Sequence, residues 1–316
     1  MTTSNKYRAI IASSHVDSHR EMLTKEALEK IVETINSKDK RVRMGVDHRR
    51  DFPPKGRLEN AELIETDGYF SVMADFCEYE NSKLVEWNDD LIIEYFDDAF
   101  QFVEVETKEP SETSISLDPN NFNSIEEVKK IQENLKLNNN IDFKLSLHGR
   151  KSDVPDPEII FKFASSLLLY QLIKPTIKKI GDKVADEIAD KSIEEIKKIT
   201  KFITNTLKEV FYHCIPKMRP VTIVFDFPGE PHIELIARTR NEKLVLKALK
   251  ENQLTEIKNE IKSLNKNVKI AKAQFLLSDK GKWKFNYLIT ESGQTIGKKV
   301  AFKNREKRLQ IISKSH

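Results

Sequence analysis

The chain is 316 residues long, which is enough for two domains of ordinary size. Hydrophobic residues make up 39% and charged residues 33% of it, as in soluble globular proteins with well-solvated surfaces. Lys and Arg number 53 against 50 Asp and Glu, and this small surplus does not indicate a nucleic-acid-binding protein. The two cysteines, Cys77 and Cys214, are too few and too far apart for a disulfide framework or a metal knuckle. We therefore expect a cytoplasmic protein.

The sequence also argues against membrane insertion. The first fifteen residues, MTTSNKYRAIIASSH, lack the apolar core of a signal peptide. The most membrane-like run covers residues 159–173, but it is shorter than the ~20 residues of a spanning helix and is interrupted by Lys162 and Gln171. This run favours a buried helix, or a helix face for a partner, over a membrane span.

Apolar and alternating runs predict a strand-rich first half. Thr24 is an N-cap for a helix with an apolar stripe, and Ser124 opens a second helix as a capping box with Glu127. The Asp67-Gly68 pair predicts a tight turn between two antiparallel strands. Residues 89–100 fit either a helix or a strand. Further strands are predicted at residues 7–13, 101–106, 112–117 and 141–147.

The second half has a different pattern. Residues 158–212 are almost entirely typical of helices, and residues 243–265 predict one long charged helix. Strands are predicted at residues 221–227, 233–238, 273–277, 283–290 and 295–302.

These elements predict an α+β protein in three parts. Residues 1–150 would form a closed or partly closed β-barrel with outer helices, 151–215 a long helical segment, and 216–316 a small α+β domain of unknown role.

The order of motifs in the first half resembles a known family. The run ASSHVDSHREMLTKEAL is followed by a His-bearing loop, VDHRRDFPPKG, then by the DG hairpin and an SISL strand. This order resembles the phage prohead (capsid maturation) proteases, relatives of the herpesvirus assembly proteases. Asp17 and the helix from Thr24 match the opening of that family. The resemblance covers roughly residues 6–150.

The resemblance implies a catalytic site. His48 matches the family's catalytic histidine, and Ser114 matches its nucleophile, although Ser116 stands where the family usually has glycine. Lys144 occupies the position of the acidic third member, which is a departure from the pattern. His148 could take that third role, in the His-Ser-His manner of the herpesvirus branch.

The chemistry of such a site sets clear requirements. A serine hydroxyl needs a neutral imidazole to take its proton, and that imidazole needs a third group to orient it. The oxyanion needs donors, which Arg49, Arg50 or backbone amides near Ser114 could supply. The alternative is that Ser114 is a solvent-facing strand residue and His48 a surface residue paired with a neighbouring aspartate.

Three functions follow from these patterns. The first is a serine endopeptidase, intact or degenerate, acting on a protein substrate in capsid maturation or in a repurposed bacterial context. The second is a catalytically inactive protease-fold module that binds or senses a partner protein. The third is a membrane- or oligomer-forming effector that uses a helix at residues 158–180. We expect a protein partner and homo-oligomers, with no cofactor and no specific nucleic acid.

Three other features have simpler explanations than a binding site. His15 and His19 flank Asp17, but no further ligand is near in sequence, so a surface loop is favoured over a metal site. The basic residues 298–314 predict a solvated strand and a frayed terminus rather than a phosphate-binding tail. The aromatic residues Trp283, Phe285 and Tyr287 alternate and are predicted to share one apolar face.

Overall fold

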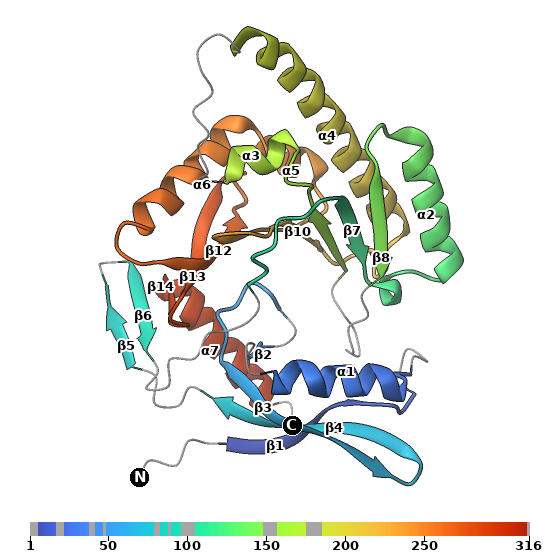
Figure 1. Ribbon diagram of the computed structural model, residues 1–316, viewed down its shortest axis with the longest axis vertical. Helices are drawn as coiled ribbons and strands as arrows, with labels where there is room; N and C mark the ends of the chain where they lie inside the picture. The colour runs from blue at the N-terminus through green and yellow to red at the C-terminus, as the bar shows by residue number, and fades with distance from the viewer. Residues whose placement is uncertain are drawn as a thin grey trace.

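The protein is an α+β fold with two open β-sheets (Figure 1). The computed structural model describes residues 6–16, 22–37, 42–46, 49–78, 83–87, 90–95, 105–147, 157–174 and 185–314. The small sheet has four strands in the order β1-β4-β3-β2, and the large sheet has ten in the order β5-β6-β14-β13-β12-β11-β10-β9-β7-β8. In Figure 1 most helices lie on one side of the large sheet, and the small sheet lies beyond its other side.

The small sheet follows the sequence-based prediction closely. Its strands are β1 (Lys6–Ser13), β2 (Val42–Met44), β3 (Gly56–Thr66) and β4 (Tyr69–Glu78), and helix α1 (Lys25–Asn36) packs on one face. The Thr24 hydroxyl accepts a hydrogen bond from the Ala27 amide at 3.2 Å, as expected of an N-cap. Asp67 and Gly68 both have positive φ, at 52° and 80°. A two-residue turn that matches the twist of a hairpin needs this backbone conformation, so the hairpin prediction is confirmed.

The large sheet is mixed. Its ten strands are β5 (Lys83–Glu86), β6 (Leu91–Tyr95), β7 (Thr113–Leu117), β8 (Phe143–Leu147), β9 (Glu158–Lys162), β10 (Val221–Phe227), β11 (His232–Thr239), β12 (Ile270–Leu277), β13 (Trp283–Thr290) and β14 (Thr295–Lys298). The pairs β7–β8, β9–β10 and β11–β12 are parallel, and the other pairs are antiparallel.

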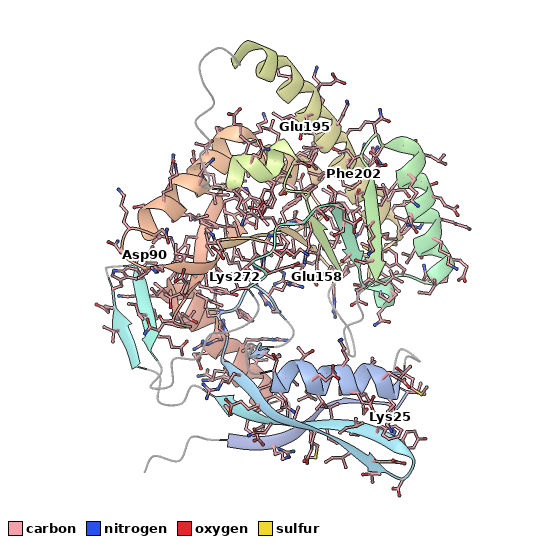
Figure 2. The ribbon with its side chains drawn as sticks, viewed as in Figure 1. Lys25, Asp90, Glu158, Glu195, Phe202 and Lys272 are labelled. Atoms are coloured by element: carbon pink, nitrogen blue, oxygen red, sulfur yellow. The ribbon has the colours of Figure 1, made fainter. Side chains whose placement is uncertain are left out.

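One face of the large sheet carries the main hydrophobic core. It is covered by α2 (Ile125–Asn138), α3 (Leu168–Ile173), α4 (Ala185–His213), α5 (Glu242–Ala248) and α6 (Glu251–Leu264). Phe161 and Phe225 stack on neighbouring strands with ring centroids 5.3 Å apart, and Phe202 of α4 meets Phe161 edge-on. Figure 2 shows Phe202 on this helix side, whereas Glu158 and Lys272 lie toward the opposite side.

The predicted barrel is not found. Neither sheet closes on itself in the part of the chain that the structure describes. Strands β5 to β8 belong to the large sheet, which therefore takes strands from all three predicted parts and crosses both boundaries, at 150/151 and 215/216. The reason is apolar pairing: Ile115 and Leu117 of β7 lie beside Phe161 and Ile159 of β9 and share the main core with them.

Three local predictions were wrong. Residues 158–162 form strand β9 instead of the start of a helix, and the only described helix within 158–180 is the six-residue α3. The single helix expected at residues 243–265 is two, α5 and α6, separated at Leu249 and Lys250. Residues 299–314 form helix α7 (Lys299–Lys314) rather than a strand and frayed end. Among the described helices, none combines the length and apolarity needed to cross a bilayer.

Helix α7 is fixed by a buried ion pair. The Arg305 guanidinium, which is 2% exposed, lies 2.9 Å from both carboxylate oxygens of Glu94 on β6 and also donates to the Pro54 carbonyl at 2.6 Å. This bidentate pair explains why a strongly basic segment is ordered against the sheet.

Candidate functional site

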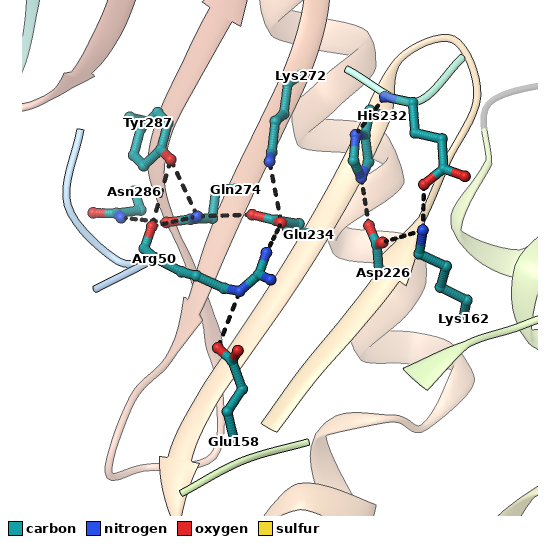
Figure 3. A network of polar contacts seen from close by, with 11 residues as sticks. Arg50, Glu158, Lys162, Asp226, His232, Glu234, Lys272, Gln274, Asn286 and Tyr287 are labelled. Atoms are coloured by element: carbon teal, nitrogen blue, oxygen red, sulfur yellow. Dashed lines mark hydrogen bonds and ion pairs between the residues drawn. The ribbon is translucent and has the colours of Figure 1, made fainter. Parts of the chain in front are cut away.

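The candidate site is a line of polar side chains that crosses the face of the large sheet opposite the main core. We call it the polar row. Strand register places one member of it on each of six neighbouring strands: Ser114, Lys162, Asp226, Glu234, Gln274 and Tyr287. Directly paired residues in a sheet point to the same face, so the register alone brings these groups into one line. Figure 3 shows the part of the row that spans β9 to β13.

Alternation along each strand produces this arrangement. Asp226 stands between Phe225 and Phe227, which both point into the main core. Glu234 stands in the same way between Ile233 and Leu235. Successive side chains of a strand point to opposite faces, so a lone charged residue in an apolar strand is turned away from the core.

Tyr287 reaches the polar row because of an irregularity in β13. Gln274 pairs with Tyr287, yet the next residue, Phe275, pairs with Phe285, so β13 carries one extra residue at Asn286. This bulge turns Tyr287 away from the core face that Trp283 and Phe285 occupy. The prediction of one shared apolar face was therefore wrong for Tyr287.

Arg50 joins the loop before β3 to the polar row. Its guanidinium lies 3.0 Å from Glu158 of β9 and 3.2 Å from Glu234 of β11. Lys272 of β12 lies 3.1 Å from the same Glu234 carboxylate, and both of those side chains are almost completely buried. The carboxylate of Glu234 is thus shared between two cations (Figure 3).

The backbone of this loop is held as well. The side-chain amide of Gln274 donates to the Arg50 backbone carbonyl at 2.9 Å, and the side-chain amide of Asn286 donates to the Asp51 backbone carbonyl at 2.8 Å. Asn286 and Gln274 are themselves hydrogen bonded at 2.8 Å. Residues 50 and 51 therefore lie on the sheet over β12 and β13, and they cover this end of the polar row.

The other end of the row contains an aspartate, a histidine and a lysine. His232 Nε2 donates to Asp226, while His232 Nδ1 accepts a hydrogen bond from the Glu106 amide at 3.2 Å. Lys162 is ion-paired with the Glu106 carboxylate and lies 3.6 Å from Asp226. Both nitrogens of the imidazole are engaged, and the backbone donor at Nδ1 fixes the tautomer that carries its proton on Nε2.

The electrostatics follow from burial and pairing. Burial alone would raise the pKa of the Asp226 carboxyl, but the His232 hydrogen bond and nearby positive charge hold that pKa below its ordinary value. Burial would likewise raise the pKa of the Glu234 carboxyl, but the positive charges of Lys272 and Arg50 hold that pKa far below its usual range. Both carboxyl groups are thus ionised, and cations within the network compensate their charge.

Asp226, His232 and Glu234 also form a candidate metal-binding group, because one ligand atom from each lies within 4.8 Å of the others. The tautomer argues against this use. A metal on His232 Nε2 would require a proton on Nδ1, which instead accepts the Glu106 amide hydrogen. The acidic groups already have Lys162, Lys272 and Arg50 as counterions. The residues fit an ion-paired network better than a metal centre.

The predicted catalytic residues are only partly within the described chain. Ser114 is half-buried on β7, at the end of the polar row, where its paired neighbours are Lys144 and Lys162. His48, His148 and Asp17 lie outside the described residues. Lys144 is exposed and lies 3.8 Å from Glu112, so its side chain is solvated. Arg50, one of the three alternatives for the oxyanion donor, is paired with Glu158 and Glu234.

Comparisons with known proteins do not assign a family. Neither a protein-family model, nor a curated protein, nor a solved structure matches the chain.

The sequence contained a signal for the part of the site that motif matching missed. Charged or amide residues stand at single positions inside otherwise apolar strands, as in VFDF, HIEL and AKAQF. Such residues are costly to bury unless they are paired, so each of these strands must have a polar partner elsewhere. The pattern indicates that partners exist, but it does not say which strands lie side by side.

Proposed function

We propose that this chain is a catalytically inactive relative of the prohead-protease type, acting as a binding or sensor protein for a protein partner. The observation that carries the proposal is the state of the bases on the polar face. His232, the described histidine of that face, uses both ring nitrogens, and Lys162 beside Ser114 is held between two carboxylates. A serine without a free base is a poor nucleophile at neutral pH.

The spacing across the sheet supports the same conclusion. The Arg50 carbonyl contacts Gln274 on β12, and β12 is four strand positions from β7, which carries Ser114. At about 4.8 Å per strand, Ser114 and Gln274 are separated by roughly 19 Å. The backbone of Arg50, two residues after His48 in the sequence, is therefore held at a point far from Ser114.

The experiment is labelling with a serine-directed fluorophosphonate, read by intact mass and peptide mapping. We expect no adduct on the wild-type chain at neutral pH and no self-cleavage on prolonged incubation. Ser114→Ala and Ser116→Ala are matched variants, because both serines lie on β7 and face the same side of the sheet. An adduct that is lost in Ser114→Ala and kept in Ser116→Ala would overturn the proposal.

The second candidate is the serine endopeptidase itself, acting on a protein substrate. It is favoured by one observation: the Ser114 side chain is half-buried and points to the polar face rather than the core. The departures from the family pattern at Lys144 and Ser116 count against it. Labelling at Ser114 that also disappears in His48→Ala would establish this candidate in place of the first.

A further inference from the structure

A pocket of about 580 Å³ lies among four helices on the side of the large sheet away from the polar row. Helix α3 packs against α4 and α6, and α4 packs against α5, so the walls come from separate parts of the chain. The residues around it are Leu169, Leu172, Ile196, Ile199, Thr200, Ile203, Lys243, Leu246, Lys247, Leu249, Lys250 and Glu251. Its size is within the range of small-molecule sites in proteins.

The interior of this pocket is apolar. Leu169 and Ile199 are buried, and Leu246 and Leu249 are half-buried beside them. The wall formed by α3 is held in place, because the carboxylate of Glu195 on α4 accepts a hydrogen bond from the Leu168 amide at 2.6 Å. That bond satisfies a free amide at the start of α3, which has no side-chain cap of its own. The cavity is therefore a feature of fixed helix packing.

The mouth of the pocket is positively charged. Lys243, Lys247 and Lys250 line it, and all three are exposed, whereas Glu251 is the one acidic residue in the lining. Lys243 and Lys247 are four residues apart on α5 and so project from the same side of that helix. An apolar interior with a cationic mouth is complementary to a molecule that has an apolar body and an anionic end.

We propose that this pocket binds a single-chain amphiphilic anion of the fatty-acid class. The alkyl chain would lie among the leucine and isoleucine side chains of α3, α4 and α5, and the carboxylate would lie at the three lysines. A partner helix is the less suitable occupant, because a helix in a groove is recognised along several turns, whereas this lining is confined to one cavity. The proposal is independent of Ser114 and of the inactive-protease conclusion.

The test is displacement of a fluorescent fatty acid from the full-length protein by octanoate, dodecanoate and hexadecanoate, each below its micelle concentration. We expect affinity to increase with chain length up to the capacity of the cavity, because each added methylene removes more apolar surface from water. Dodecanol is the matched neutral probe and should bind more weakly than dodecanoate. No displacement by any acid, or equal binding of alcohol and acid, would overturn the proposal.

Three variants test the location of the site. A triple variant with Lys243→Glu, Lys247→Glu and Lys250→Glu reverses the charge at the mouth and should weaken dodecanoate binding at least about ten-fold. Lys262→Glu, Lys266→Glu and Lys307→Glu make the same charge change at exposed lysines outside the lining and should leave binding within about two-fold. Leu246→Trp fills part of the cavity, so the longest fatty acid that still binds should have a shorter chain than in wild type. Equal weakening by both triple variants would overturn the assignment, as would tight competition by an acidic amphipathic peptide.

Discussion

Both faces of the large sheet contain buried side chains, but different interactions stabilise them. The helix-covered face is filled by apolar side chains such as Phe161 and Leu235, which pack without directional requirements. The opposite face carries the polar row, where Glu234 lies against Lys272 and Arg50. Adjacent residues of one strand, Glu234 and Leu235, therefore belong to the two environments and allow a direct comparison.

The comparison shows what each face tolerates. On the apolar face, a smaller side chain lowers the free energy of unfolding in proportion to the cavity that it leaves. The cavity remains because the surrounding side chains repack only in part. A charged network is less tolerant, because removing one partner leaves the other ion in a site with little water. The two faces also differ in what they can do: charged groups that are paired with one another are suited to holding two parts of the chain together, and less suited to proton transfer.

The largest effect should come from Glu234→Leu. It removes the carboxylate next to the buried Lys272 ammonium and should lower the free energy of unfolding by about 3 to 5 kcal/mol. Adding Lys272→Met should recover most of that loss, because the charge left behind is then removed too. Urea unfolding of both variants measures this. A double variant no more stable than the single one would mean that the ion pair is not the source of the loss.

Leu235→Ala tests the other face at the neighbouring position. Leu235 is completely buried in the main core, so we expect a loss of about 3 kcal/mol. The same urea titrations provide the value. Leu235→Met nearly conserves the volume and should cost under about 1.5 kcal/mol. A loss for Leu235→Ala that exceeds the loss for Glu234→Leu would reverse the ranking of the two faces.

A third prediction concerns pH and Lys174, which lies at the end of α3 and donates to the Pro231 carbonyl at 2.6 Å. Burial lowers the pKa of this lysine from 10.5 to about 7, although nearby carboxylates oppose the shift. Between pH 7 and 10.5 the unfolded chain then binds more protons than the folded one, so this group makes folding more favourable as pH rises. Below pH 7 the lysine is protonated in both states and the burial penalty is complete.

Lys174→Met should remove this dependence. From pH 7 to pH 9, wild type should gain roughly 1 to 3 kcal/mol of unfolding free energy relative to the variant. Denaturant titrations at several pH values compare the two. Parallel pH profiles for wild type and variant would contradict a shifted lysine at this position.

The smallest effect should come from Arg50→Met. About a third of this side chain is exposed, so solvent weakens its ion pairs with Glu158 and Glu234, and we expect a loss of about 1 to 2 kcal/mol. Arg50→Lys retains the charge without the fork of the guanidinium and should lie between wild type and Arg50→Met. Increased protease cleavage within residues 49–55 would accompany the loss if Arg50 fastens this loop. Unchanged stability and cleavage would mean that the backbone contacts alone fasten it.

Local signals in the sequence predicted the small sheet well. The Thr24 cap and the Asp67-Gly68 turn act within a few residues, and the structure contains both. The large sheet was harder, because its strand order depends on contacts between distant segments. The run IIFKF fits a strand or a buried helix equally well by pattern, and only its pairing with β7 and β10 makes it a strand.

The candidate site was predictable in part. The resemblance to a protease led to Ser114, which does lie on the polar face, whereas His48 and His148 lie outside the described residues. The remaining members, such as Asp226 and Gln274, belong to five strands that come together only when the whole sheet forms. Their isolated polar positions indicate partners, but strand order decides which ones. Arg50, one of three alternatives for the oxyanion donor, instead binds two glutamates.

In the described part of the polar face, the imidazole of His232 and the ammonium groups of Lys162 and Lys272 are all engaged by neighbouring groups, and the tautomer of His232 tests this most directly. Nitrogen-15 correlation spectra of the folded protein at neutral pH, assigned with His232→Gln, report which ring nitrogen carries the proton. We expect a proton on Nε2 and a hydrogen-bonded, unprotonated Nδ1, because the Glu106 amide donates to Nδ1. A proton on Nδ1 with an unprotonated Nε2 would show a base available on this face, and it would contradict the account.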